Sequence, residues 1–324
     1  MTKSKSKIKH SKFKIGPVKA FLSVAALACF VMLFVGGPDY YSSRSFKTAW
    51  GLGHIFAFAI WSFILVCYWS KLREMEFYLQ GLWLLGIALI IGVVTEFIQI
   101  FVGRTPLLTD LLRDLEGVAF VLAFLSPARK LISKIKLRSL QIVILGIIIF
   151  ESYPLAIVLA DEIVARNQFP VLADFETPFE TSRTDSQSAS RTDKISKNGK
   201  HSIAVTLTTD LYSGIGLKYF PGDWSDYAYL NFSVYNPENM PLRIICRVND
   251  RAHVGAEQLY EDRFNRSFEL HEGWNNIKIS LGDIANAPKD RKMNMQKIQG
   301  FGIFAIQLPE PRVIYLDYIH LSRS

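Results

Sequence analysis

The stretch GVVTEFIQIFVGRTPLLTDLLRDLEG, residues 92–117, places charged and amide side chains inside two strongly apolar segments. A charged side chain at the centre of a lipid bilayer costs about 3 kcal/mol on insertion scales, and more in simulations. Charges that remain at such positions face a partner, a cavity or a substrate. The stretch therefore predicts helices that gather their polar side chains into one site. These side chains are Glu96, Gln99, Arg104, Asp110, Arg113, Asp114 and Glu116.

The two halves of the 324-residue chain differ in composition. Residues 1–160 carry 18 Lys and Arg against 8 Asp and Glu, whereas residues 161–324 carry 19 against 21. The first half is membrane-like, and the second has the composition of an ordinary soluble domain. The excess positive charge stands beside apolar segments, where it sets orientation, so no nucleic-acid partner is expected. The cysteines Cys29, Cys67 and Cys246 have no metal-ligand spacing, which argues against a zinc site or a disulfide scaffold.

Apolar segments predict five membrane-spanning helices, each close to the roughly 20 residues that cross a bilayer. They cover about residues 18–35, 50–69, 81–102, 107–125 and 140–160. With five crossings, the basic residues before the first helix, between the second and third, and between the fourth and fifth share one side. The positive-inside rule assigns that side to the cytoplasm, so the N-terminus is predicted to be cytoplasmic and residues 161–324 to be exported.

The polar residues of the third and fourth predicted helices share faces. Helical spacing places Glu96 and Gln99 on one face of the third helix, and Asp110 and Asp114 on one face of the fourth. A short link joins these helices as a tight hairpin, with Arg104 at its outer mouth, within reach of Asp110. The predicted intramembrane polar site also takes residues from the second helix and consists of Lys47, His54, Glu96, Gln99, Arg104, Asp110 and Asp114.

The order of these residues resembles the VanZ-like membrane family over about residues 40–125. That family's pattern is a Lys followed by a His that opens a span, then Glu-x-x-Gln, an Arg, and Asp-x-x-x-Asn-x-x-Gly. The matching residues are Lys47, His54, Glu96, Gln99, Arg104, Asp110 and Gly117. Asp114 stands where the family has Asn, and the Lys–His spacing is longer than usual. The family is named for a member linked to glycopeptide resistance, so the resemblance implies a cell-envelope context and no particular reaction.

Three interpretations of the polar site stay open. It could be structural, with polar pairs that lock a helical hairpin. It could bind a lipid headgroup or a lipid-linked glycan, with Arg104 and Lys47 at phosphate. It could be catalytic, with His54, Glu96 and Asp110 as acid and base. No nucleophile with an adjacent base, Gly-rich phosphate loop or HExxH motif is present, which favours a non-enzymatic role. Glu151 in the last helix is interpreted as a helix-packing carboxyl.

Residues 161–324 change to short alternating runs that predict an all-β sandwich or jelly roll. A polar loop is predicted at residues 177–200, where Ser, Thr, Asp, Lys and Arg prevail. The predicted strands are 171–175, 202–208, 214–220, 227–235, 242–249, 266–270, 275–281, 300–306 and 313–321.

Strands 227–235 and 242–249 are predicted to pair as a hairpin about residues 236–241, with one core side and one polar face. Aromatic rings stack on the C–H faces of sugars, and Arg and Asn bind hydroxyl groups. The alternative is a solvated face with ordinary cross-strand pairs. The face gives the glycan-binding candidates Tyr229, Asn231, Tyr235, Arg243, Arg247 and Asn249.

Four runs give residues 170–322 a resemblance to galactose-binding-like jelly rolls, which include many carbohydrate-binding modules. They are residues 174–176, 223–227, 273–275 and 315–319. Such modules often hold a structural calcium between the first and last strands, and the resemblance implies Glu176 and Asp317 as its ligands. No other cofactor is expected.

These features predict a protein of the bacterial inner membrane, with a basic cytoplasmic tail at residues 1–17. A VanZ-like transmembrane domain follows at 18–160, and a β-sandwich at 161–324 lies in the periplasm or outside the cell. The favoured function is a non-enzymatic envelope protein that binds a glycan or glycolipid, with membrane lipid as a further partner. The alternatives are a membrane enzyme that modifies an envelope lipid or antibiotic, and an assembly or sensor subunit that contacts another envelope protein.

Overall fold

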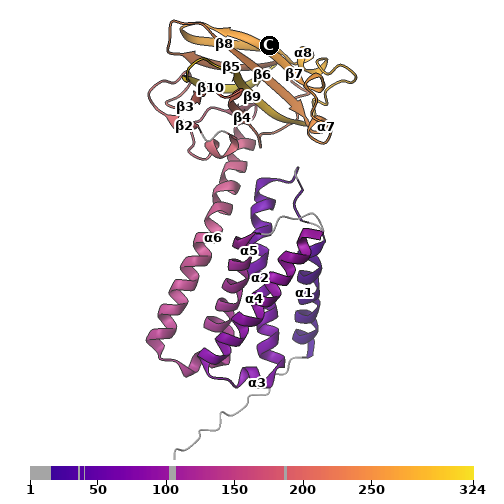
Figure 1. The fold of residues 1–324 in the computed structure, drawn as a ribbon, viewed down its shortest axis with the longest axis vertical. Coiled ribbons are helices and arrows are strands. Elements are labelled where there is room, and N and C mark those ends of the chain that lie inside the picture. The colour runs from indigo at the N-terminus through magenta and orange to yellow at the C-terminus, as the bar shows by residue number, and fades with distance from the viewer. Residues whose placement is uncertain (1–15, 36, 40, 102–106, 186–187) are drawn as a thin grey trace, which may run out of the picture. The chain divides into compact units, whose positions relative to one another are not determined.

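The computed structural model describes residues 16–35, 37–39, 41–101, 107–185 and 188–324, with side chains described from residue 20 onward. It divides into two compact units. One holds residues up to 42 and residues 46–154, and the other holds residues 43–45 and 155–324. The first unit is helical and the second is built from two β-sheets (Figure 1). The division falls at Pro154, inside a continuous helix, whereas the sequence predicted a boundary at residue 160.

The first unit forms where the sequence is apolar. Its long helices begin a few residues before the predicted spans, apart from the segment that carries the acidic residues. The helices are α1 (Gly16–Phe34), α2 (Arg44–Tyr68), α3 (Ser70–Arg73), α4 (Phe77–Phe101), α5 (Leu108–Phe120), the π-helical η1 (Val121–Leu125), the 3₁₀ helix η2 (Pro127–Leu131) and α6 (Lys134–Gln168).

Three of the described helices, α2, α4 and α6, are long and apolar enough to cross a membrane, and α1 adds a shorter apolar helix. The sequence predicted five crossings. The predicted span at 107–125 is helical from Leu108 to Leu125 and consists of two consecutive segments, α5 and the π-helical η1. Of these, α5 carries acidic and basic residues along its length. Membrane crossing itself stays a prediction.

The first unit buries polar groups and exposes apolar ones. His54, Gln80 and Asp114 are buried, whereas Phe56 and Leu82 are largely exposed. The distribution is the reverse of a water-soluble bundle, in which an apolar stripe faces the core. Phe58, Leu84 and Val118 still form a small apolar core among the helices. The other buried residues of this core are Ala57, Val66, Leu72, Phe77, Ala88, Leu122 and Ala128.

Helices α2 and α5 approach very closely at Gly117. A Cβ atom at this position would lie 2.3 Å from the main-chain oxygen of Ile55 and 2.8 Å from the main-chain nitrogen of Ala59. Because these neighbours are main-chain atoms, they cannot move aside as a flexible side chain would. The contact therefore requires glycine, and it brings the polar side chains of α2 and α5 within reach of one another.

The second unit is an antiparallel β-sandwich. Its strands are β1 (Val171–Ala173), β2 (Ala189–Thr192), β3 (Ser202–Leu207), β4 (Tyr212–Leu217), β5 (Tyr229–Asn236), β6 (Leu242–Asp250), β7 (Phe264–Leu270), β8 (Gly273–Ser280), β9 (Ile298–Ile306) and β10 (Arg312–Ser322). The first sheet has the order β2-β3-β10-β5-β8, with β1 also paired to β10, and the second has the order β4-β9-β6-β7. Short helices are η3 (Glu180–Arg183), α7 (Arg251–Val254), η4 (Tyr260–Asp262) and α8 (Leu281–Ala285).

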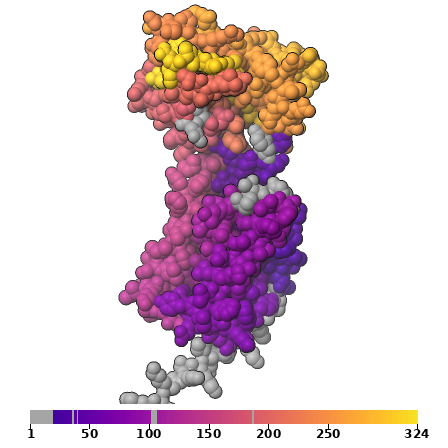
Figure 2. Space-filling view, viewed as in Figure 1, coloured from indigo at the N-terminus to yellow at the C-terminus, as the bar shows by residue number. Residues whose placement is uncertain are grey.

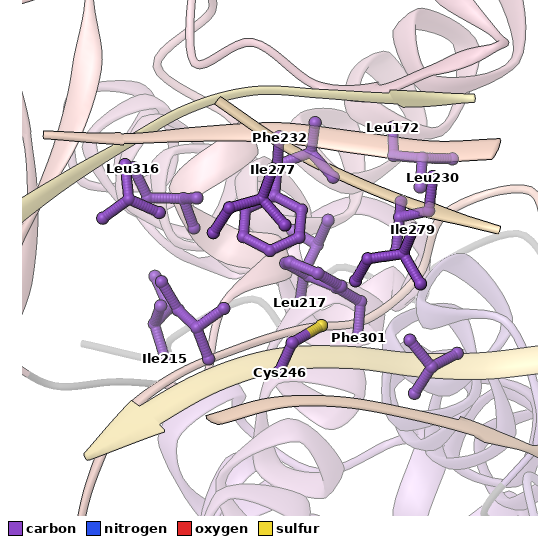
Figure 3. Close-up of a cluster of buried hydrophobic side chains, with 14 of the residues drawn as sticks. Leu172, Ile215, Leu217, Leu230, Phe232, Cys246, Ile277, Ile279, Phe301 and Leu316 are labelled. Carbon is purple, nitrogen blue, oxygen red and sulfur yellow. The ribbon is translucent and has the colours of Figure 1, made fainter. Parts of the chain in front are cut away.

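The inner faces of the two sheets form one apolar core. Leu230, Phe232 and Ile279 of the first sheet lie opposite Cys246 and Phe301 of the second (Figure 3). The rings of Phe232 and Phe301 meet edge to face across this core, with their centroids 5.2 Å apart. In the space-filling view the C-terminal residues, in yellow, reach the surface of the sandwich (Figure 2). The outer side chains of β10 are half-buried.

The end of α6 is fixed to the sandwich by a buried ion pair. The Nε of Arg183, in η3, donates to both carboxylate oxygens of Asp161 at 3.0 Å, and its Nη1 donates to the carbonyl of Leu172 at 2.8 Å. Arg183 and Asp161 are both fully buried. The guanidinium therefore joins a helix, a 3₁₀ turn and the first strand.

All nine predicted strands are confirmed, with their ends shifted by a few residues. The predicted polar loop at 177–200 is wrong in part, because it contains η3 and the strand β2. β2 pairs with β3 alone and so forms an edge of the first sheet. An edge strand needs no apolar alternation, and its sequence Ala-Ser-Arg-Thr offered none.

The predicted hairpin of β5 and β6 is wrong. β5 pairs with β8 and β10 in the first sheet, and β6 pairs with β7 and β9 in the second. Each strand directs its apolar residues inward, so the two strands face each other across the core instead of lying side by side. The predicted polar face is therefore divided: Tyr229, Asn231 and Tyr235 lie outside the first sheet, and Arg243, Arg247 and Asn249 lie outside the second.

Gly117→Ala is expected to destabilise the protein, because the added methyl group overlaps main-chain atoms of α2. Overpacking of this kind costs about 1–3 kcal/mol. The measurement is the thermal unfolding midpoint of the purified full chain in detergent. Gly86→Ala in α4 is the matched control, since a Cβ there has no atom within 4 Å. Equal midpoints for the two variants would show that α2 and α5 do not depend on this contact.

Candidate functional site

The helical unit holds a buried His between two Asp side chains. A hydrogen bond of 2.9 Å joins His54 Nδ1, on α2, to Asp114 Oδ1, on α5. His54 Nε2 lies 3.7 Å from Asp110 Oδ2, one turn earlier on α5. Asp114 is fully buried, and its Oδ2 has no hydrogen-bond partner among the described residues. The imidazole is therefore oriented by one carboxylate and presents its other nitrogen to a second.

Arg113 and Glu151 extend this cluster to α6. Arg113 Nη1 donates to Asp110 Oδ1 at 2.9 Å, and its Nε donates to Glu151 Oε2, also at 2.9 Å. The sequence analysis noted both charges but placed neither in the site. The signal available was the charge itself, since a cation and an acid that both lie in apolar segments are expected to pair.

Glu96 and Gln99 of α4 contact main-chain groups of other segments. Glu96 Oε2 accepts a hydrogen bond from the Leu107 main-chain nitrogen at 2.9 Å, and Gln99 donates to the Leu33 carbonyl of α1 at 3.0 Å. Arg104 lies outside the described residues, and Lys47 lies two turns before His54 in α2.

His54, Glu96 and Asp110 offer ligand atoms that lie within 4.8 Å of one another. Among the described residues, these three side chains form the one group of at least three His, Cys, Asp or Glu residues whose ligand atoms lie this close together. Nitrogen and carboxylate ligands of this kind suit a divalent cation, and the carboxylate of Asp114 behind the imidazole resembles the support that metal-bound histidines receive.

The side chains on the outer face of the first sheet contact one another. The ring of Tyr235 contacts those of Trp274 and Tyr315, with centroids 5.4 Å and 6.1 Å away. Asn231 donates to the Ser322 hydroxyl at 3.0 Å, and Lys278 Nζ lies 3.9 Å from the centre of the Tyr229 ring. Trp274 thus packs against the ring of Tyr235 on the neighbouring strand.

The outer face of the second sheet has a different character. Its strands β4 and β9 carry glycines at the paired positions Gly216 and Gly302, where other residues would place side chains. A Cβ at Gly302 would lie 3.9 Å from Arg247 Nη2, and one at Gly300 would lie 3.0 Å from Asn249 Oδ1. The side chains of Arg247 and Asn249 therefore lie over β9.

Aromatic side chains continue the same face. Tyr212 of β4 is 66% exposed, and its ring meets that of Phe304 of β9 edge to face at 5.9 Å. Beyond β7, the guanidinium of Arg263 lies over the ring of Tyr260, 5.6 Å from its centre. We call Tyr212, Arg247, Asn249, Tyr260, Arg263, Asn265 and Phe304 the second-sheet outer face.

Several polar atoms of the second-sheet outer face are buried without a partner. In the described residues, Arg247 Nε, Arg263 Nε and Asn265 Oδ1 form no hydrogen bond. Burial and the positive charge of Arg247 both lower the pKa of Arg263. This face therefore holds hydrogen-bonding capacity that the fold itself does not use.

The two predicted calcium ligands contact main-chain donors. Glu176 Oε1 accepts hydrogen bonds from the nitrogens of Lys200 and His201, both at 2.7 Å. Asp317 Oδ2 accepts from the nitrogens of Lys197 and Asn198, at 2.6 Å and 3.0 Å. Both carboxylates thus hold the turn at residues 197–201. The calcium prediction is untested.

No family model and no curated protein sequence matches the chain. The resemblance to the VanZ-like family therefore stays a prediction. Solved structures match the second unit. One is a family 11 carbohydrate-binding module from Clostridium thermocellum in complex with a β-1,3-1,4-mixed-linked tetrasaccharide. It is 15% identical, with a TM-score of 0.35, and the match covers 48% of this chain and 95% of that one.

Two further matches have similar scores. An exo-β-agarase is 15% identical with a TM-score of 0.37, over 48% of this chain and 25% of that one. A carbohydrate-binding module specific for non-crystalline cellulose is 10% identical with a TM-score of 0.35, over 48% of this chain and 95% of that one. At these identities and scores, what those proteins bind does not carry over to this chain.

Glu176→Gln is expected to lower the free energy of unfolding of the second unit by about 1–2 kcal/mol, because hydrogen bonds to a charged group are lost. Burial opposes the charge of Glu176, but the N–H groups of His201 and Lys200 outweigh it and lower the pKa. The stabilisation is therefore present at neutral pH and lost as the pH falls below the ordinary value of 4.5.

The measurement is the unfolding midpoint of the full chain by circular dichroism at pH 7 and at pH 3, with and without added calcium. The exposed Glu269→Gln is the control. A Glu176→Gln deficit that is as large at pH 3 as at pH 7 would contradict the role given to the carboxylate. A midpoint that rises with calcium in the native chain alone would instead support the calcium prediction.

Proposed function

We propose that the protein is anchored in a bacterial inner membrane by its helical unit and binds a glycan through its exported β-sandwich. The apolar exterior and polar interior of the helical unit support the membrane anchor, because lipid-facing helices expose apolar side chains and keep ionisable ones inside. The N-terminus lies in the cytoplasm in this proposal, as the loop charges predict.

The second-sheet outer face is the proposed glycan site. The observation that carries the proposal is the exposed ring of Tyr212 beside polar atoms of Arg247 and Asn265 that lack partners. A sugar ring can stack on the aromatic face, and its hydroxyl groups both donate and accept hydrogen bonds. Gly300 and Gly302 of β9 place no side chains of their own on this face, so an extended ligand can reach Arg247.

The unused hydrogen-bonding capacity favours this face over the outer face of the first sheet. There, Ser233 donates to Asn276 and Asn231 donates to Ser322, so a ligand would have to break existing bonds. The aromatic rings of the first sheet are then cross-strand packing.

Tyr212→Ala is expected to weaken saccharide binding about tenfold, because the stacking surface is lost and such contacts contribute on the order of 1 kcal/mol. The measurement is a glycan array with the purified full chain in detergent, followed by titration of the best binder. Tyr229→Ala, on the first sheet, is the matched control and should bind as the native chain does. Loss with Tyr229→Ala and none with Tyr212→Ala would move the site to the other face, and no retained saccharide would refute the proposal.

A membrane enzyme is the second candidate function. It is favoured by the buried hydrogen bond between His54 and Asp114, because a His oriented by a carboxylate is the usual form of a general base. The neighbouring Asp110 and Glu96 would supply an acid or hold a divalent cation. The substrate would be an envelope lipid or an antibiotic that reaches the polar interior.

The enzyme candidate predicts that cells producing the native chain change their envelope lipids and that His54→Gln abolishes the change. Mass spectrometry of extracted lipids is the measurement, and glycan binding should persist in the variant. Ser152→Ala is the control, since that hydroxyl only donates to the Ile148 carbonyl within α6. Lipid profiles that are the same with and without the native chain would reject this candidate.

A further inference from the structure

We propose that the second-sheet outer face recognises an acidic saccharide, whose carboxylate or sulfate group binds between Arg247 and Arg263. The inference rests on the proposed glycan-binding function and specifies its ligand class. It is carried by two guanidinium groups that lie near each other, face an aromatic surface and have no acidic partner among the described residues.

Several arginines of the second unit pair with an acid. The exposed Arg266 pairs with Asp283, the half-buried Arg291 with Asp250 and Asp262, and the buried Arg312 with Glu238. Among the described residues, Arg247 and Arg263 form no such pair. A half-buried charge without a counter-ion is unfavourable unless a ligand supplies one.

Two acids stand near this face, and neither pairs with Arg247 or Arg263 among the described residues. The carboxylate of Asp185 accepts a hydrogen bond from the Gly216 nitrogen at 2.6 Å and lies 3.5 Å from Lys218 Nζ. Glu269 stands opposite Arg243 in the register of β6 and β7, and Arg243 donates to the Ser267 hydroxyl at 3.1 Å.

The two guanidinium groups belong to neighbouring positions of the same face. Arg247 is opposite Asn265 in the register of β6 and β7, and Arg263 precedes Asn265 by two residues. Burial and the charge of Arg247 both lower the pKa of Arg263. An anion bound between the two groups would offset their like charges. Guanidinium groups bind carboxylates and sulfates through two parallel N–H donors, which a hydroxyl group cannot match.

The surroundings indicate that the anion belongs to a sugar. Tyr260 lies beneath Arg263 and is 62% exposed, and Tyr212 stands exposed on the neighbouring strand pair. Asn265 Oδ1 lacks a donor, while its Nδ2 donates to the Tyr260 carbonyl at 3.0 Å. Exposed rings suit the C–H faces of a sugar, and the free amide oxygen suits a hydroxyl group. A bare phosphate or sulfate ion would leave both unused.

The test compares saccharides that differ in charge alone. The purified full chain in detergent is titrated with an oligogalacturonate and its methyl ester, and with a carrageenan oligosaccharide in sulfated and desulfated forms. We expect one acidic member to bind at least about tenfold more tightly than its neutral partner, since charge-assisted hydrogen bonds are about twice as strong as neutral ones. This preference should fall as salt is raised.

Arg247→Gln and Arg263→Gln should each remove most of the preference for the acidic member. A thermal unfolding midpoint equal to that of the native chain shows that the variants are folded. Arg266→Gln, an exposed arginine of the same strand β7 that pairs with Asp283, is the matched control and should keep the preference.

The outcomes distinguish a failure of the acidic-ligand proposal from a failure of the glycan-binding function on which it rests. Neutral saccharides that bind through Tyr212, with no gain from the acidic group, would overturn the acidic ligand and leave the glycan-binding function standing. A charge preference that survives both arginine variants would overturn the assigned residues. If free sulfate bound as tightly as the sulfated oligosaccharide, the assignment of a saccharide as the ligand would be overturned. No binding of any member would overturn both proposals.

Discussion

Burying a polar side chain is favourable only when a partner is buried with it, and this constraint organises both units of the chain. In the helical unit the hydrogen bond between His54 and Asp114 holds α2 against α5, and the close contact at Gly117 makes that bond geometrically possible. Arg113 then connects Asp110 to Glu151, so α6 joins the same network.

The same constraint explains how the second unit begins. Arg183 is fully buried, and it is tolerated because Asp161 and the Leu172 carbonyl satisfy its donors. Removing the acid would leave a buried cation, which is among the more destabilising changes, at about 3–5 kcal/mol. The turn at residues 197–201 is held in a comparable way, by two carboxylates that accept main-chain N–H groups.

The sequence predicted the elements better than their partners. Apolar length located the helices, and alternation located nine strands, because both depend on local periodicity. Alternation says which side chains face the core, but it does not say which sheet a strand joins. β5 and β6 have the same pattern whether they pair or face each other, so the predicted hairpin and its single polar face were wrong. The edge strand β2 had no apolar pattern to detect.

Helical spacing predicted that Asp110 and Asp114 share a face, but no spacing relates His54, on another helix, to either of them. The hydrogen bond between His54 and Asp114 depends on how α2 packs against α5. The link between Arg113 and Glu151 depends on where α6 packs, and no local pattern records that. Arg247 was identified as a candidate, whereas Arg263 and Asn265 were not, because they become neighbours only through the register of β6 with β7.

Net charge is a poor guide to the ligand of such a domain. Residues 161–324 carry slightly more acidic than basic residues, so the whole domain would be expected to repel anions weakly. Charges a Debye length or more apart are largely screened, however, and the nearby Asp185 pairs with Lys218. What a ligand meets there is the local excess of Arg247 and Arg263 beside exposed tyrosines. The chemistry of recognition is thus set by which charges the fold leaves without a partner.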